Sequence, residues 1–137
     1  MQLFIWMLLS ILTTPSNVPS DAILGEYWTE DRSGKIAIYK CSYKYCGRII
    51  WRKENKKDSQ NPDVTKRDRK VVGIQFLNDF EFDKKSSVWK GGTVYSIDNG
   101  NTYNGKIWLE DNGQTLKMRG FIGFSLLGKT ATLRRVD

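Results

Sequence analysis

The 137-residue sequence contains no histidine, and this absence excludes several kinds of functional site. Ser-His-Asp and Cys-His catalysis use an imidazole as the general base, and His-ligated zinc sites use it as a ligand. Histidine pH switches depend on its titration. None of these sites can be built from this chain. The sequence therefore favours a non-enzymatic protein, with an enzyme that lacks histidine as an open alternative.

Long apolar runs are missing as well. The most apolar run, residues 3–12, is too short to cross a bilayer, which takes roughly 20 apolar residues. Small and polar residues follow it, and Ser20-x-Ala22 fits the cleavage site of a secretory signal peptide. We expect residues 1–22 to be a signal peptide and residues 23–137 to form one domain. Cleavage after Ser20, or an N-terminal segment packed on the domain, are the alternatives.

Proline is scarce, and apolar residues alternate with polar ones through most of the chain. The clearest stretch, residues 88–121, holds three strands separated by Asn-Gly turn signals at 98–101 and 111–113. The other predicted strands are 25–29, 35–41, 46–51, 71–77, 80–82 and 128–136. In the third of these strands we expect Ile49 and Trp51 on one side. The pattern predicts an all-β fold, an antiparallel up-and-down meander closed into a barrel of about eight strands.

Negative charge is the weaker sign: 15 Asp and Glu oppose 22 Lys and Arg, which gives a formal net charge of +7. Many of the cations lie in residues 52–70, a stretch without aromatic residues that predicts a long exposed loop. Such clusters suit nucleic acid, anionic lipid or polysaccharide equally well. Because an exported protein rarely meets nucleic acid, we expect no nucleic-acid partner. An anionic envelope surface and a merely solvated loop stay open.

Only two cysteines are present, Cys41 and Cys46. If Tyr43 and Lys44 form a two-residue turn, the cysteines face each other as a non-hydrogen-bonded pair. Their Cα atoms would then lie about 4.5 Å apart, near the lower limit for a disulfide. An exported chain meets an oxidising compartment, so we predict a disulfide, with two reduced thiols as the alternative.

The chain after the predicted signal peptide resembles the bacterial family DUF2147. The resemblance is carried, in order, by Gly25–Trp28, Ile38–Cys41, Cys46–Ile49, Asn61–Asp63, Trp89–Gly92, Leu116–Gly123 and Gly128–Thr130. It implies a small protein, periplasmic or secreted, with a lipocalin-like barrel and no established reaction. Gly25 and Trp28 are similar to the Gly-x-Trp motif of lipocalins, with Tyr27 in the usual Trp position. Arg134 or Arg135 resembles the late arginine that stacks on that Trp.

A barrel of about eight strands has room inside for side chains or for one small ligand. The candidate ligand-binding residues are Tyr27, Trp89, Gly91, Gly92, Tyr95, Tyr103 and Arg119. The aromatic residues would give apolar walls with hydroxyl groups, the glycines would free interior volume, and Arg119 could meet a polar or acidic head group. A core filled by these aromatic side chains is the alternative.

We therefore predict an exported protein that binds a small hydrophobic or amphipathic molecule, such as a fatty acid. We expect no cofactor and no metal ion. The alternative function is an interaction protein of the cell envelope, which uses the basic loop to contact anionic lipid, polysaccharide or a protein partner.

Overall fold

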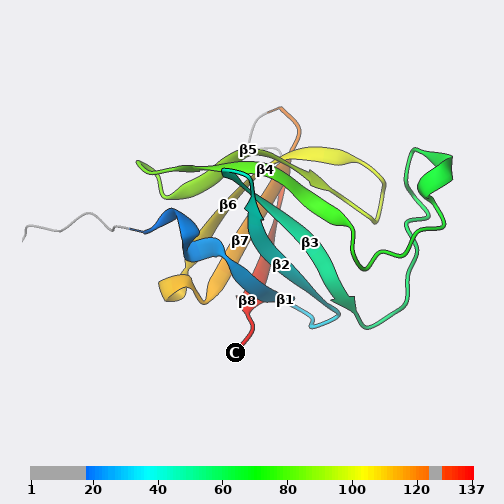
Figure 1. The fold of residues 1–137 in the computed structure, drawn as a ribbon, viewed down its shortest axis with the longest axis horizontal. Coiled ribbons are helices and arrows are strands. Elements are labelled where there is room, and N and C mark those ends of the chain that lie inside the picture. The colour runs from blue at the N-terminus through cyan, green and yellow to red at the C-terminus, as the bar shows by residue number, and fades with distance from the viewer. Residues whose placement is uncertain (1–17, 124–127) are drawn as a thin grey trace, which may run out of the picture.

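The computed structural model describes residues 18–123 and 128–137 of the chain. Within them, eight antiparallel strands pair in chain order, and β1 also pairs with β8, so that the sheet closes into a barrel (Figure 1). The strands are β1 (Gly25–Thr29), β2 (Gly34–Cys41), β3 (Lys44–Arg52), β4 (Gln75–Asp83), β5 (Val88–Tyr95), β6 (Thr102–Glu110), β7 (Thr115–Phe121) and β8 (Gly128–Arg135). The predicted up-and-down barrel is confirmed. No helix in the described part of the chain is long and apolar enough to span a membrane.

Most of the predicted signal peptide, up to residue 17, lies outside the described residues. Its last residues belong to the 3-10 helix η2 (Ser20–Ile23), which packs on one end of the barrel. Ile23 is fully buried, the Trp89 indole donates a hydrogen bond to the backbone oxygen of Ser20, and the Tyr27 hydroxyl donates to that of Ile23. We call this end, with η2 and η4 (Asp111–Gly113), the closed end; both helices lie at the left of Figure 1.

Large apolar side chains fill the barrel near the closed end. Tyr27, Trp89, Ile107 and Leu116 are almost completely buried, and the Phe82 ring packs against Trp89 with centroids 4.6 Å apart. Full burial of such a side chain contributes about 1.5–3 kcal/mol. This half of the barrel is a packed core.

Arg135 of β8 links the elements of the closed end. Its guanidinium lies over the Tyr27 ring, 4.7 Å from the ring centroid. It also donates hydrogen bonds to the backbone oxygens of Ala22, Leu24 and Gly113. Of the two arginines considered from the sequence, Arg135 is the one that stacks on Tyr27, the central residue of β1.

Phe80 occupies the middle of the barrel, beside two glycines. Gly92 and Gly105 are paired across β5 and β6, and a Cβ atom at either position would overlap the Phe80 ring. The side-chain-free positions therefore make room for this ring. Gly91 lies where the β5–β6 register shifts, and it has a positive φ of 81°, which glycine adopts at no steric cost.

The Cys41–Cys46 disulfide is confirmed, but the predicted register of its hairpin is wrong. Cys41 pairs with Lys44, so Ser42 and Tyr43 form the turn, and the cysteines are diagonal neighbours with Cα atoms 5.8 Å apart. That separation lies well inside the usual range for a disulfide. Ser42 adopts a positive φ of 65°, the turn geometry that matches the twist of a two-residue hairpin.

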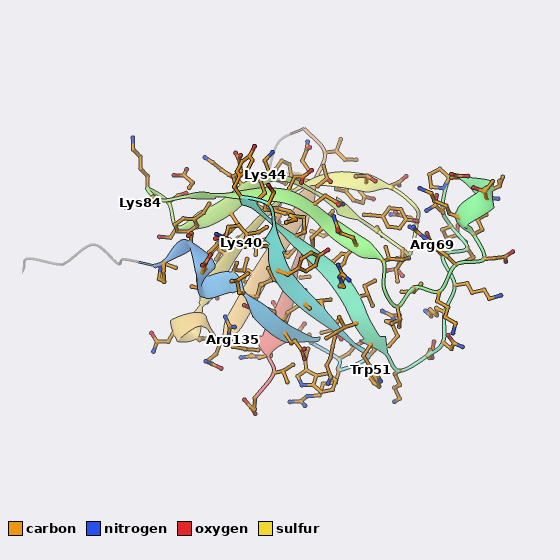
Figure 2. All side chains as sticks on the ribbon, in the orientation of Figure 1. Lys40, Lys44, Trp51, Arg69, Lys84 and Arg135 are labelled. Carbon is orange, nitrogen blue, oxygen red and sulfur yellow. A yellow bond between two sulfur atoms is a disulfide. The ribbon has the colours of Figure 1, made fainter. Side chains whose placement is uncertain are left out.

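A β-bulge at Ile50 shows that the expectation of Ile49 and Trp51 on one side of the strand is wrong. Ile36 pairs with Ile49 and Lys35 pairs with Trp51, so Ile50 has no partner on β2. Ile49 and Trp51 therefore lie on opposite sides, because the extra residue reverses the alternation. Ile49 is buried, whereas Trp51 is 41% exposed and packs edge-on against Trp28 on the outer wall (Figure 2).

Candidate functional site

A cavity of about 1170 Å³ lies at the end of the barrel opposite the closed end, and it opens to solvent. The β1–β2 turn, the end of β3, the beginning of β4, the β5–β6 turn, the end of β7 and the beginning of β8 surround it. We call this end the mouth. Small-molecule sites have volumes of roughly 300–1,000 Å³, so the cavity is large enough for one.

Apolar side chains from most of the strands form the cavity wall. They are Ile36, Ile49, Phe76, Val94, Met118, Ala131 and Leu133, joined near the mouth by Ile97, Phe121 and Ile122. Such a wall with a few polar groups is the usual composition of a ligand site. Alternation places these residues inward, since β-strand side chains point to opposite faces in turn.

Two of the predicted site residues, Tyr95 and Tyr103, line the cavity. The Tyr103 hydroxyl accepts a hydrogen bond from the Asn99 side chain and keeps its own proton to donate. The Tyr95 hydroxyl donates to Asp58, 2.6 Å away. Burial and this neighbouring carboxylate raise the pKa of Tyr95 to about 12, so it remains a hydrogen-bond donor at neutral pH.

The other predicted site residues lie elsewhere. Tyr27 and Trp89 are buried at the closed end, and Gly92 lies against Phe80. Gly91 is at the β5 bulge, and Arg119 donates a hydrogen bond to the Thr130 hydroxyl. None of these five residues is part of the cavity wall in the described structure. A role for them in ligand binding stays a prediction.

The β3–β4 loop, residues 53–74, carries exposed charges as predicted, but it is organised around a buried carboxylate. Asp58 is fully buried and accepts hydrogen bonds from Tyr95, Asn61 and Arg69 at 2.6, 2.7 and 2.9 Å. Burial alone would raise the pKa of Asp58, but these three donors outweigh it and hold the pKa below its ordinary value of 3.8. The expectation that the whole stretch is an exposed loop is therefore wrong at Asp58 and at Asn61.

This loop is packed against the rim of the mouth. Gly100, in the β5–β6 turn, lies so close to the backbone of Gln60 that a Cβ atom there would overlap the Gln60 oxygen. The loop and the β5–β6 turn lie together at the right of Figure 1, and Arg69 extends from the loop in Figure 2. Asp58 and Tyr95 thus tie the charged loop to the strand that lines the cavity.

Charged side chains surround the mouth. Arg52 and Lys129 are the cationic residues of the cavity wall, and Glu30, Asp31 and Asp98 are the acidic ones. Asp31 accepts hydrogen bonds from Ser33 and Thr29 within its own turn, and these lower its pKa to about 2. Sequence reasoning missed Arg52, because the bulge that turns it inward has no signal such as glycine.

The described residues contain one group of possible metal ligands, Cys41, Cys46 and Asp79. The two sulfur atoms are joined in the disulfide, so a single carboxylate is left to bind an ion. This group is therefore no metal site in the oxidised protein.

Comparison with protein families decides the classification. A family described as an uncharacterised protein conserved in bacteria, DUF2147, matches residues 25–135, which span the barrel from β1 to β8. The chain belongs to the DUF2147 family. No curated protein matches this DUF2147 sequence.

A solved structure supports the same fold for this DUF2147 protein. The structure is entitled "Protein HP1028 from the human pathogen Helicobacter pylori belongs to the lipocalin family". It superposes with a TM-score of 0.73 at 26% sequence identity, over 84% of this chain and 83% of that one. The barrel is thus lipocalin-like, a fold that suits the binding of small ligands in general. The disulfide fits an oxidising compartment outside the cytoplasm.

Proposed function

We propose that this DUF2147 protein is exported and binds one small amphipathic molecule, similar to a fatty acid, in the barrel. The observation that carries the proposal is the open, apolar cavity of about 1170 Å³. Burial of an acyl chain against this wall removes apolar surface from water, which contributes about 0.8 kcal/mol for each CH₂ group.

The packing of the barrel gives the proposed ligand a direction. Phe80 and the residues beneath it fill the closed end, so the chain enters through the mouth and lies above Phe80. Its polar head group then stays near the mouth, where Tyr103 and the charged residues lie. Tyr95 and Tyr103 are the predicted residues that we place in contact with the ligand.

A substitution that fills the cavity tests this proposal. Ala131 lies in the cavity wall, opposite Met118 on β7, so Ala131→Trp would occupy the space of the ligand. We expect stripped wild-type protein to bind hexadecanoic acid in calorimetric titration, and Ala131→Trp to bind it at least about tenfold more weakly because a filled site cannot accept the chain. Val72→Trp is the matched control, since Val72 is exposed and outside the cavity wall.

Native mass spectrometry of protein purified from the bacterial envelope gives a second readout. A bound mass on the wild type that is missing from Ala131→Trp is the expected result. An apo mass, together with no binding across a series of fatty acids, would contradict the proposal.

The basic loop supports a second candidate function, contact with an anionic envelope surface. Its exposed cations, apart from Arg69, which is paired with Asp58, are Lys53, Lys56, Lys57, Lys66, Arg67 and Lys70. Asp58 holds the loop in one conformation, so these charges are presented together. Sedimentation with phosphatidylglycerol vesicles tests this function: binding that disappears at moderate salt and persists in Ala131→Trp supports it, and its absence at low salt refutes it.

A further inference from the structure

Arg52, the last residue of β3, points toward the cavity because of the bulge at Ile50. Without the extra residue, alternation from the inward Ile49 would direct Arg52 outward. With it, Trp51 lies on the outer wall and Arg52 lies beside Gly34 of β2, within the cavity wall. Bulges are frequent next to functional sites, where they redirect a side chain.

The space for this side chain is provided by a glycine. Gly34 is buried and paired with Arg52, and a Cβ atom there would lie 3.2 Å from the Arg52 Cδ. The aliphatic part of Arg52 therefore lies across a position that has no side chain of its own. Two local features, the Ile50 bulge and Gly34, together place one guanidinium in the wall of an apolar cavity.

The Arg52 guanidinium also has unused hydrogen-bonding capacity. Its Nε is buried and makes no hydrogen bond to any described residue. Arg52 takes part in none of the ion pairs among the described residues. Asp31, in the same wall, is already engaged by Ser33 and Thr29. A buried donor without a partner is rare in folded proteins, and its cost is removed when an acceptor arrives.

We propose that Arg52 binds the anionic oxygen atoms of the head group of the ligand. The planar guanidinium presents paired N–H donors that match a carboxylate or a phosphate, and such charge-assisted bonds are the stronger ones. Lys129, on β8, also lines the cavity and is its second cation, beside the acidic residues Glu30, Asp31 and Asp98. The inference rests on the proposed function, and it narrows the ligand to an anionic amphiphile.

Arg52 is a second candidate for the head group beside Arg119, whose role in ligand binding stays a prediction. Arg119 alternates with Met118, a cavity residue, and it donates to the Thr130 hydroxyl. Arg48 is the matched control for a change at Arg52, since it is an exposed arginine on the same strand, outside the cavity wall, with its guanidinium over the Tyr39 ring.

Three ligands with the same chain length test the assignment: hexadecanoic acid, hexadecyl phosphate and hexadecanol. We expect Arg52→Gln to bind the acid and the phosphate about ten- to a hundredfold more weakly, which corresponds to the loss of a hydrogen bond to a charged group. Hexadecanol has no negative charge, so we expect its affinity for Arg52→Gln to equal that for the wild type. Arg48→Gln should bind all three ligands as the wild type does.

The outcomes separate this inference from the proposed function. If Arg52→Gln binds the acid and the phosphate as tightly as the wild type does, the assignment of Arg52 is wrong while the cavity remains a ligand site. If no ligand of the three binds the wild type, the proposed function and the inference both fail. Unchanged binding of hexadecanol by Arg52→Gln shows that the variant is folded. A loss confined to the acid indicates a fatty acid, and a loss confined to the phosphate indicates a phospholipid head group.

Discussion

Asp58 shows how a single carboxylate can organise a charged loop. Three donors converge on it, and one of them, Tyr95, comes from the strand that lines the cavity. Each hydrogen bond to a buried charge contributes about 1.5–3 kcal/mol, but burial of the carboxylate offsets much of that sum. The net effect is local, because Asp58 fixes the β3–β4 loop against the barrel.

The lowered pKa of Asp58 predicts that acid releases this loop. The carboxyl group has its ordinary pKa of 3.8 in the unfolded chain and a lower one in the folded protein. Its stabilising contribution is therefore complete well above pH 3.8, and it is lost as the pH falls below 3.8 through the folded value. We expect the protection of residues 55–70 against hydrogen exchange, measured relative to the intrinsic rate at each pH, to fall in this range before the strands open.

Asp58→Asn supplies the control for this pH effect. It should expose the loop to exchange and proteolysis already at neutral pH, at a cost of about 1–3 kcal/mol, because Arg69 and Tyr95 lose a charged acceptor. Its loop should then show a smaller further change on acidification, which comes from Asp63, whose pKa is lowered by the hydrogen bonds from Thr65. Asp68 is an exposed carboxyl group on the same loop, so Asp68→Asn should behave like the wild type. Equal acid sensitivity in Asp58→Asn and the wild type would contradict the assignment.

At the scale of elements, η2 belongs to the folded barrel. Its buried Ile23 and the backbone oxygens of Ser20 and Ala22 are held by side chains of β1, β5 and β8. Cleavage of a signal peptide after Ala22 would remove two of these acceptors. If a signal peptide is removed from this chain, we therefore expect cleavage before Ser20.

Two truncated proteins test this expectation. A chain that begins at Val18 should unfold at the temperature of the full-length chain. One that begins at Leu24 should unfold well below it, because Trp89 and Arg135 lose their partners and Ile23 no longer covers the core. Calorimetry of the two proteins measures the difference. Equal unfolding temperatures would show that η2 contributes nothing to the fold.

The strands and their order could be predicted from the sequence, because alternation and Asn-Gly turns are local signals. The register of the β2–β3 hairpin could not be predicted correctly. Its turn begins at Ser42, which adopts a positive φ, and such a conformation is uncommon for serine. The bulge at Ile50 involves an aliphatic residue among others of the same kind, so nothing in the sequence marks it. Tyr95 and Tyr103 were found because they alternate with polar residues, whereas Arg52 depended on the bulge.

The packing of the barrel interior could not be predicted from the sequence either. Gly92 and Gly105 are side-chain-free positions, and such positions can either enlarge a cavity or admit a large neighbour. Which of the two occurs depends on Phe80, which comes from another strand. Asp58 was equally hidden, because a carboxyl group in a charged stretch gives no sign that Tyr95 reaches it from 37 residues away.

At the scale of the whole molecule, Arg135 closes the barrel. It joins β8 to the carbonyl groups of Ala22, Leu24 and Gly113 while it covers the Tyr27 ring. Arg135→Met should lower the free energy of unfolding by about 2–4 kcal/mol, because several carbonyl groups lose their donor at once. Arg134→Met, at the exposed neighbouring position, should cost less than about 1 kcal/mol.

Denaturant unfolding of both variants measures this difference. Equal losses at the two positions would show that the hydrogen bonds of Arg135 do not govern the closure of the sheet. The comparison requires that the free energy of unfolding falls with denaturant concentration at a similar slope in both variants and the wild type. This slope reports the surface exposed on unfolding.

Buried side chains, Phe80 among them, fill one half of the barrel, and the other half holds the cavity. Residues of the closed half determine whether the chain folds, and residues of the mouth determine what it can hold. Wall residues that pair with the packed half, such as Met118 with Ile107 and Leu133 with Leu116, are coupled to it, whereas the turn residues of the mouth have no cross-strand partner there. The mouth can thus accumulate changes in selectivity while the closed half preserves the scaffold, which makes this barrel a suitable starting point for the redesign of binding specificity.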